Sequence, residues 1–87
     1  MKYTVVWSKA AEEKLANLWL DDEQREQITR ATNEIDQRLQ QDPQNEGESR
    51  ENDRRVLIVP PLAVYFRVSV ADRVVQVLTI RRVKRRT

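Results

Sequence analysis

The sequence predicts an α+β domain in which a helical hairpin packs on one face of a mainly antiparallel four-stranded sheet. Three observations support this fold class. Residues 2–7 are short, β-branched and aromatic, residues 9–41 repeat apolar side chains at a helical period, and residues 54–82 read as three strands. The expected order is therefore β-α-α-β-β-β. A chain of 87 residues is long enough for one domain and too short for two, so a single domain is expected over residues 1–87.

The first strand is predicted over residues 2–7, KYTVVW. Ser8 suits the N-cap of the helix that follows, because a serine hydroxyl can accept a hydrogen bond from a backbone N–H of the first turn. Trp7 is expected in the core, and so is one apolar stripe of the helix. The members of this stripe are Ala11, Leu15, Leu18 and Trp19.

A second helix is predicted to run to about Gln41, with Asp21 or Asp22 as its N-cap. Some 20 residues would make a rod about 30 Å long. The short break before it favours an antiparallel helical hairpin. Its expected buried stripe consists of Ile28, Ala31, Ile35 and Leu39.

Residues 42–53, DPQNEGESREND, hold the single glycine of the chain and are predicted to form a loop. A loop of this length is often functional or mobile. Arg50, which follows Gly47, is expected to pair with the acidic helical half rather than with RNA.

Three strands are predicted over residues 54–59, 62–70 and 73–80. Pro60 and Pro61 end the first of them, because proline cannot donate to a central ladder. In the second, Leu62 and every second residue after it are expected to face the core, so that Tyr65 and Arg67 face the other way. In the third, one face is predicted to carry Val74, Leu78 and Ile80, and the other Arg73, Val75, Val77, Thr79 and Arg81.

Two helices can cover only one face of the sheet, so Tyr65, Arg67 and Arg81 are expected on a partly open face. The charge is unevenly distributed, since residues 9–53 hold 13 acidic and 6 basic residues, whereas residues 54–87 hold 9 basic residues and one acid. Such asymmetry indicates a polyanionic partner. The alternative is that residues 81–87 form a solvated basic tail that keeps the protein soluble.

Composition excludes several kinds of chemistry. The chain has no histidine and no cysteine, which excludes metal sites built on those ligands and a Ser-His-Asp triad. One glycine in the whole chain excludes glycine-rich phosphate loops. No metal and no cofactor is therefore expected. No membrane association is expected either, because no apolar run approaches the ~20 residues of a membrane span and no signal peptide is recognised.

The chain resembles the RelE/ParE superfamily of small toxins from bacterial type II toxin–antitoxin systems. The resemblance covers residues 2–82. It is carried by the element order with WSKAAEEKL after the first strand, and by the spacing P-x-x-x-G-x-x-R at Pro43, Gly47 and Arg50. The strand V-Y-F-R-V and the ending D-R-V-V-x-V-L-x-I-R-R complete it.

The resemblance implies a cytoplasmic bacterial toxin, of the kind associated with plasmid stabilization, that is neutralised by a cognate antitoxin. RelE-like members cut mRNA in the ribosomal A site without a metal, and ParE-like members poison DNA gyrase. We expect growth inhibition by RelE-type, ribosome-dependent mRNA cleavage, which would make the chain a metal-independent endoribonuclease (mRNA interferase). The alternatives are a non-enzymatic gyrase inhibitor of ParE type and an inactive toxin fold that serves as a binding module.

Attack of a ribose 2′-OH on its phosphate needs a proton acceptor and cations around the phosphorane. Arginine fits phosphate oxygens but stays protonated, so Lys84 and Tyr65 are the candidate acceptors in the basic half. Tyr65 and Arg67 point the same way and offer a stacking ring beside a phosphate-binding fork. The predicted catalytic residues are Tyr65, Arg67, Arg81 and Lys84. The predicted nucleic-acid-binding residues are Arg54, Arg55, Arg82, Arg85 and Arg86, and an acidic antitoxin segment is an alternative partner for the terminal cations.

Overall fold

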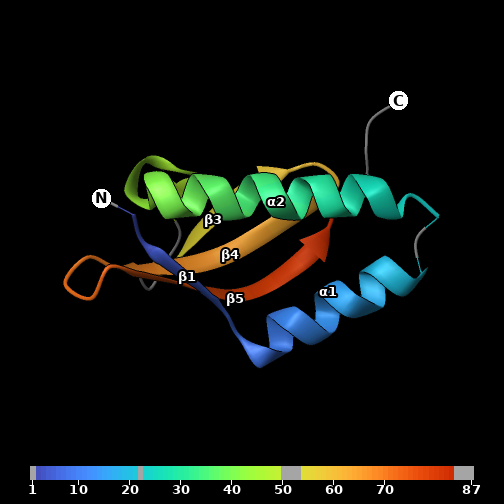
Figure 1. Cartoon of the computed structure of the whole chain (residues 1–87), viewed down its shortest axis with the longest axis horizontal. Helices are drawn as coiled ribbons and strands as arrows, with labels where there is room; N and C mark the ends of the chain where they lie inside the picture. The colour runs from blue at the N-terminus through green and yellow to red at the C-terminus, as the bar shows by residue number, and fades with distance from the viewer. Residues whose placement is uncertain (1, 22, 50–53, 84–87) are drawn as a thin grey trace.

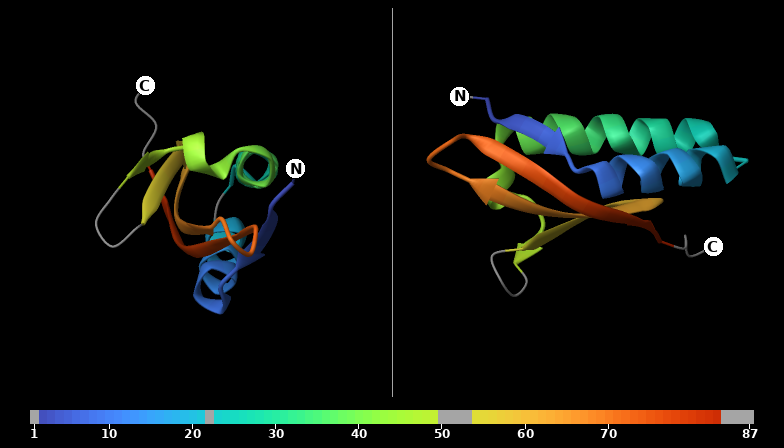
Figure 2. Two further views of the ribbon diagram at one scale, coloured as in Figure 1. Left: turned by 90° about the vertical axis from the view of Figure 1, so that its left-hand side faces the viewer. Right: turned by 90° about the horizontal axis from the view of Figure 1, so that it is seen from below.

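The fold is seen in a computed structural model that describes residues 2–21, 23–49 and 54–83. Both helices lie on the same side of the sheet, as the right-hand view of Figure 2 shows. The molecule measures 40 × 25 × 23 Å. The predicted α+β class and the hairpin on one face are therefore confirmed (Figure 1).

The sheet has the spatial order β1-β5-β4-β3-β2. β1 pairs with β5 in parallel, and all other pairs are antiparallel. Four of the strands are those that the sequence predicts, and a two-residue edge strand, β2, lies within the segment predicted to be a loop. The bounds are β1 (Thr4–Trp7), β2 (Glu48–Ser49), β3 (Arg55–Val59), β4 (Leu62–Ser69) and β5 (Val74–Arg82).

A register shift between β4 and β5 corrects the predicted faces of β5. Tyr65 lies opposite Thr79, but Phe66 lies opposite Val77, so Leu78 is an extra residue on β5. Such a bulge interrupts the alternation of faces. As a result Val75, Val77 and Ile80 are all buried in the core. The prediction that Val75 and Val77 face away from Ile80 is wrong.

The two helices are α1 (Lys9–Asp21) and α2 (Arg25–Gln41). The predicted cap of α1 is confirmed, because Ser8 Oγ accepts a hydrogen bond from the Ala11 N–H at 3.0 Å. The same hydroxyl donates to the Leu78 carbonyl at 2.8 Å and so attaches the start of α1 to β5. The second helix ends at Gln41 as predicted, but the predicted N-cap, Asp21 or Asp22, is wrong, since the N-cap is Gln24 and makes no side-chain capping bond.

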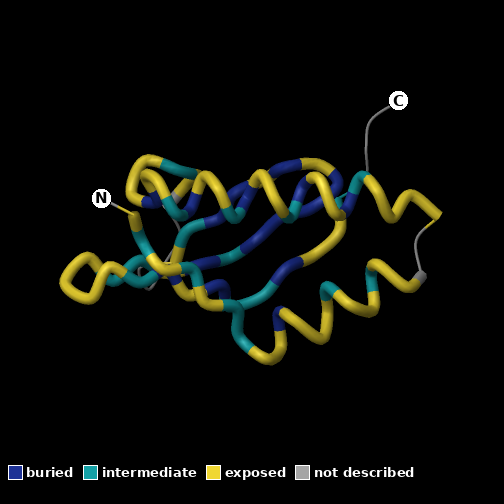
Figure 3. The backbone as a smooth tube through the Cα atoms, viewed as in Figure 1, coloured by how far each residue is buried: buried dark blue, intermediate teal, exposed yellow. Residues whose placement is uncertain are grey.

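The core lies between the helices and one face of the sheet, where the buried segments gather in Figure 3. The stripe predicted for α2 is buried in full: Ile28, Ala31, Ile35 and Leu39. The sheet contributes Leu57, Val59, Leu62, Val64, Phe66, Val75, Val77 and Ile80.

Both tryptophans were expected in the core, but their positions differ. Trp7 is half-buried and packs against the core cluster. Trp19, by contrast, is 41% exposed. It lies in the last turns of α1, which extend past the end of β5 (Figure 1), so the sheet cannot cover its ring. The prediction for Trp19 is therefore wrong.

Gly47 determines how the segment after α2 approaches β3. Its φ is +70°, and a Cβ at this position would collide with the backbone carbonyl of Val56. Gly47→Ala is therefore expected to lower the free energy of unfolding by at least about 2 kcal/mol, from backbone strain and the clash together. Urea denaturation measures the change. Gln44→Ala in the same segment is exposed and serves as the control; equal midpoints for the two variants would contradict the assignment.

Candidate functional site

The face of the sheet turned away from the helices carries four of the predicted site residues. Along β4, Leu62, Val64 and Phe66 are fully buried on the helical side. Since neighbouring residues of a strand point to opposite faces, Tyr65 and Arg67 lie on the other side. Tyr65 is half-buried and Arg67 is exposed. Both therefore lie on the predicted side of the sheet.

Strand pairing brings Arg81 to the same face. Arg81 lies opposite Ala63, and Thr79 lies opposite Tyr65. Directly opposed residues share a face, and the Cα atoms of diagonal neighbours such as Arg81 and Tyr65 are about 7–8 Å apart. Arg67 follows Tyr65 two positions along the strand, which separates their Cα atoms by about 7 Å. The phenol of Tyr65 thus lies between two exposed arginines.

Arg54 joins these residues from the neighbouring strand. Arg55 lies opposite Phe66, so the continued register places Arg54, the residue before β3, opposite Arg67. Arg54 is exposed. We call Arg54, Tyr65, Arg67 and Arg81 the free-face cluster. Three guanidinium groups around one aromatic ring form an arrangement that can bind phosphates or carboxylates and stack on a planar group.

Arg55 has a different position from Arg54, the residue before it. It lies opposite Phe66 and so belongs to the helical side of the sheet. Its Nε donates to the Glu46 carbonyl at 3.0 Å, and its Nη2 donates to the Gly47 carbonyl at 3.4 Å. The structure therefore uses Arg55 to hold the segment between α2 and β3 against the sheet.

The position of Arg55 leads to a stability prediction. Arg55→Ala is expected to lower the free energy of unfolding by about 1–3 kcal/mol, because two backbone carbonyls lose a charged donor. Arg54→Ala removes the same side chain one residue away, from an exposed position, and is expected to change stability by less than about 0.5 kcal/mol. Thermal or urea unfolding of the two variants compares them. A neutral Arg55→Ala would show that these bonds do not contribute to stability.

The predicted basic tail is partly a strand. Arg81 and Arg82 belong to β5, which corrects their assignment to a tail over residues 81–87. Arg82 lies opposite Leu62, on the helical side, and is exposed. Lys84, Arg85 and Arg86 lie outside the described residues, as does Arg50, so their predicted roles stay predictions.

Sequence reasoning missed two polar residues on the free face. Glu48 of β2 lies opposite Val56, which in turn lies opposite Tyr65. Gln76 lies opposite Arg67. Local sequence gave no signal for either. Glu48 falls in a segment predicted to be a loop, and the bulge in β5 changes which residues of that strand share a face with Gln76.

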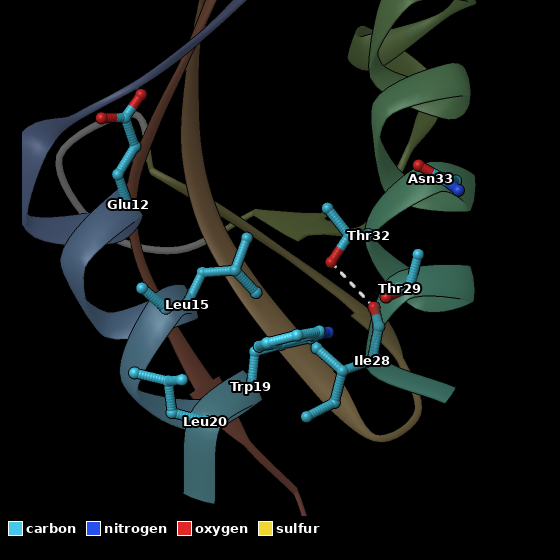
Figure 4. A pocket seen from close by; sticks show the side chains of 9 residues that line it. Glu12, Leu15, Trp19, Leu20, Ile28, Thr29, Thr32 and Asn33 are labelled. Atoms are coloured by element: carbon cyan, nitrogen blue, oxygen red, sulfur yellow. Dashed lines mark hydrogen bonds between the residues drawn. The ribbon is translucent and has the colours of Figure 1, made fainter. Parts of the chain in front are cut away.

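A separate groove lies between the two helices, away from the free-face cluster. It has a volume of about 480 Å³, and Figure 4 shows Leu15, Trp19 and Ile28 around it. Thr32 donates its hydroxyl hydrogen to the Ile28 carbonyl at 2.8 Å, which leaves the threonine methyl for the apolar wall.

Among the residues described by the structure, no group of three or more acidic, histidine or cysteine side chains could hold a metal ion. No helix in the described part of the chain is long and apolar enough to cross a membrane.

Solved structures of two toxin–antitoxin complexes have the same fold as this chain. The RelBE2 toxin–antitoxin complex from Mycobacterium tuberculosis matches with a TM-score of 0.79 and 15% identity, covering 94% of this chain and 92% of that chain. The intact RelBE complex from E. coli matches with a TM-score of 0.66 and 17% identity, covering 95% and 99%. At these identities the likeness shows the fold alone. The chain therefore shares its fold with a chain of each of these two complexes.

The family follows from the sequence itself. The model of the ParE toxin of the type II toxin–antitoxin system parDE matches residues 5–87, and the chain belongs to this family. A chromosomal ParDE system from P. aeruginosa is similar in structure, with a TM-score of 0.71 and 25% identity, covering 94% of this chain and 97% of that chain. A search of curated proteins finds no match.

Proposed function

We propose that this toxin of a type II toxin–antitoxin system inhibits growth by the ParE route, as a non-enzymatic inhibitor of DNA gyrase in the bacterial cytoplasm. The observation that carries the proposal is the match of the ParE model to residues 5–87, which cover every element of the fold except Thr4, the first residue of β1. The mRNA cleavage that the sequence alone favoured is the second candidate.

The chemistry of the free-face cluster supports a binding role. Its three cations are arginines, whose planar forks hold phosphate or carboxylate oxygens but remain protonated and are poor proton acceptors. An arginine surface therefore serves recognition better than it serves bond cleavage. The same surface offers a docking site for an acidic segment of a cognate antitoxin, and the solved relatives are toxin–antitoxin complexes.

A second candidate is RelE-type mRNA cleavage. The observation that favours it is the row across the sheet in which Glu48, Val56, Tyr65 and Thr79 follow one another, with Arg67 and Arg81 on either side of Tyr65. This row combines a carboxylate and a phenol with phosphate-binding cations. A ribose 2′-OH could then lose its proton to one of these two groups and bond to phosphorus, while the arginines hold the phosphorane. The P–O5′ bond breaks in turn, which leaves a 2′,3′-cyclic phosphate and a 5′-oxygen that takes up a proton.

One experiment with two readouts separates these candidates. The purified chain is added to a gyrase supercoiling assay, and the same protein is induced in cells whose translated mRNAs are mapped by primer extension. We expect inhibited supercoiling or trapped cleavage complexes, with intact transcripts. Cuts at A-site codons with unaffected gyrase would establish cleavage instead. Unimpaired growth after induction would indicate an inactive toxin fold that acts as a binding module.

A further inference from the structure

The flank of α1 beside its core-facing stripe carries a second stripe of side chains. Glu12, Ala16, Trp19 and Leu20 recur at i, i+4, i+7 and i+8, and all four are exposed. Trp19 is 41% exposed and Leu20 is 59% exposed. Together with the facing side of α2, this stripe lines the apolar groove between the helices (Figure 4). Burial of these side chains by a partner would be favourable.

Arg25 organises one end of this groove. Its Nε donates to the Trp19 carbonyl at 3.0 Å, and its Nη2 donates to the Leu20 carbonyl at 3.2 Å. Its guanidinium carbon lies 4.9 Å from the centre of the Trp19 ring. Arg25 thus caps the end of α1 and holds the tryptophan in place. Tryptophan and arginine dominate the energetics of many protein interfaces, and preorganised side chains lose less entropy on binding.

The groove has opposite charges at its two ends. Glu12 lines the end near the start of α1, and Arg25 lies at the other end beside Leu20. Ala16 stands midway along the stripe, four residues from Glu12 and four from Leu20. A small side chain at that midpoint allows another helix to approach closely.

We propose that this groove docks a second copy of the same chain, with the two α1 helices antiparallel and a two-fold axis near Ala16. Rotation about that axis places Glu12 of one copy beside Leu20 of the other. Arg25 of the other copy is bonded to the carbonyl of its own Leu20, so the carboxylate and the guanidinium meet. The same contact forms twice, and the Trp19 rings cover the apolar floor between the two ion pairs. A two-fold interface requires such self-complementarity.

The expected dimer is weak. A helix of 13 residues is about 20 Å long, so the contact is smaller than the ~800 Å² per partner of a standard interface. The free-face cluster lies on the other side of the sheet and stays open in this dimer. The inference therefore does not depend on the target of the toxin.

Sedimentation equilibrium of the purified chain over a range of concentrations tests the inference. We expect a monomer–dimer equilibrium with a dissociation constant on the order of 10–100 µM. Glu12→Arg and, separately, Leu20→Ser are each expected to weaken the dimer at least ~10-fold. Glu13→Arg changes the charge by the same amount one residue away, outside the groove, and should leave the dimer unchanged.

A mixing experiment is more decisive. In the proposed dimer, residue 12 of one copy meets residue 25 of the other copy at two places. Glu12→Arg therefore brings two positive charges together at each place, and Arg25→Glu brings two negative charges together. In a mixture of the two variants, both contacts join opposite charges, so the mixed dimer should be at least ~10-fold tighter than either variant alone. Circular dichroism checks that each variant is folded. A wild type that stays monomeric throughout, or a mixture no tighter than its components, would overturn the inference, even if the groove proved to bind an antitoxin.

Discussion

Phe66→Ala is expected to lower the free energy of unfolding by about 3–5 kcal/mol, the largest stability change of any single substitution considered for this chain. Phe66 is completely buried in β4 and belongs to the core between the sheet and the helices. Its removal takes away the transfer free energy of the ring and leaves a cavity that the helices and β5 can fill only in part. The total stability of so small a domain is about 5–10 kcal/mol, so this one substitution removes at least about a third of it.

Urea denaturation followed by circular dichroism measures this change. Ile58→Ala is the control, because Ile58 lies on the neighbouring strand but is 56% exposed. Its expected effect is below about 1 kcal/mol. If the two variants unfolded at the same urea concentration, the core would not lie between the helices and β4 as described.

The second large effect concerns function. Arg67→Ala combined with Arg81→Ala is expected to raise the protein concentration needed for half-inhibition of the target at least ~10-fold. Each arginine can make a charge-assisted hydrogen bond worth about 1.5–3 kcal/mol to an anionic partner, and tenfold corresponds to about 1.4 kcal/mol. Both side chains are exposed, so the fold should tolerate their removal.

Growth after induction and gyrase inhibition in vitro are the two measurements. The matched control is Lys14→Ala combined with Arg30→Ala, which removes the same positive charge from exposed positions on the helices. The control should remain as toxic as the parent chain. If both pairs abolished toxicity equally, net charge and not the free-face cluster would be responsible.

The buried stripe of α2 and the position of Trp19 on α1 show where helical periodicity succeeds and where it fails. Helical periodicity identified the buried stripe of α2, because every member of that stripe is covered by the sheet. The same periodicity placed Trp19 in the core, but its position on α1 lies beyond the sheet, where α2 supplies an arginine as its neighbour. Periodicity reports which side chains share a face of a helix. It does not report how far the opposing surface extends.

In the free-face cluster, too, the sequence predicted some residue positions and only the structure revealed others. Alternation along β4 predicted that Tyr65 and Arg67 share the uncovered face, and their exposure agrees with that placement. It did not separate Arg54 from Arg55, which are adjacent and chemically identical. Only the pairing of Arg55 with Phe66, and its bonds to Glu46 and Gly47, distinguish a residue that holds a loop from one that faces solvent.

The sequence by itself determined the element order, the faces of α2 and β4, and the family to which the chain belongs. These properties depend on patterns within single segments, where a period of 3.6 or 2 residues is read directly. Tertiary structure alone decided the bulge at Leu78, the edge strand at Glu48, the exposure of Trp19 and the grouping of Arg54 with Arg81. Each of these depends on contacts between residues far apart in the chain, and no local pattern records which distant partner a residue meets.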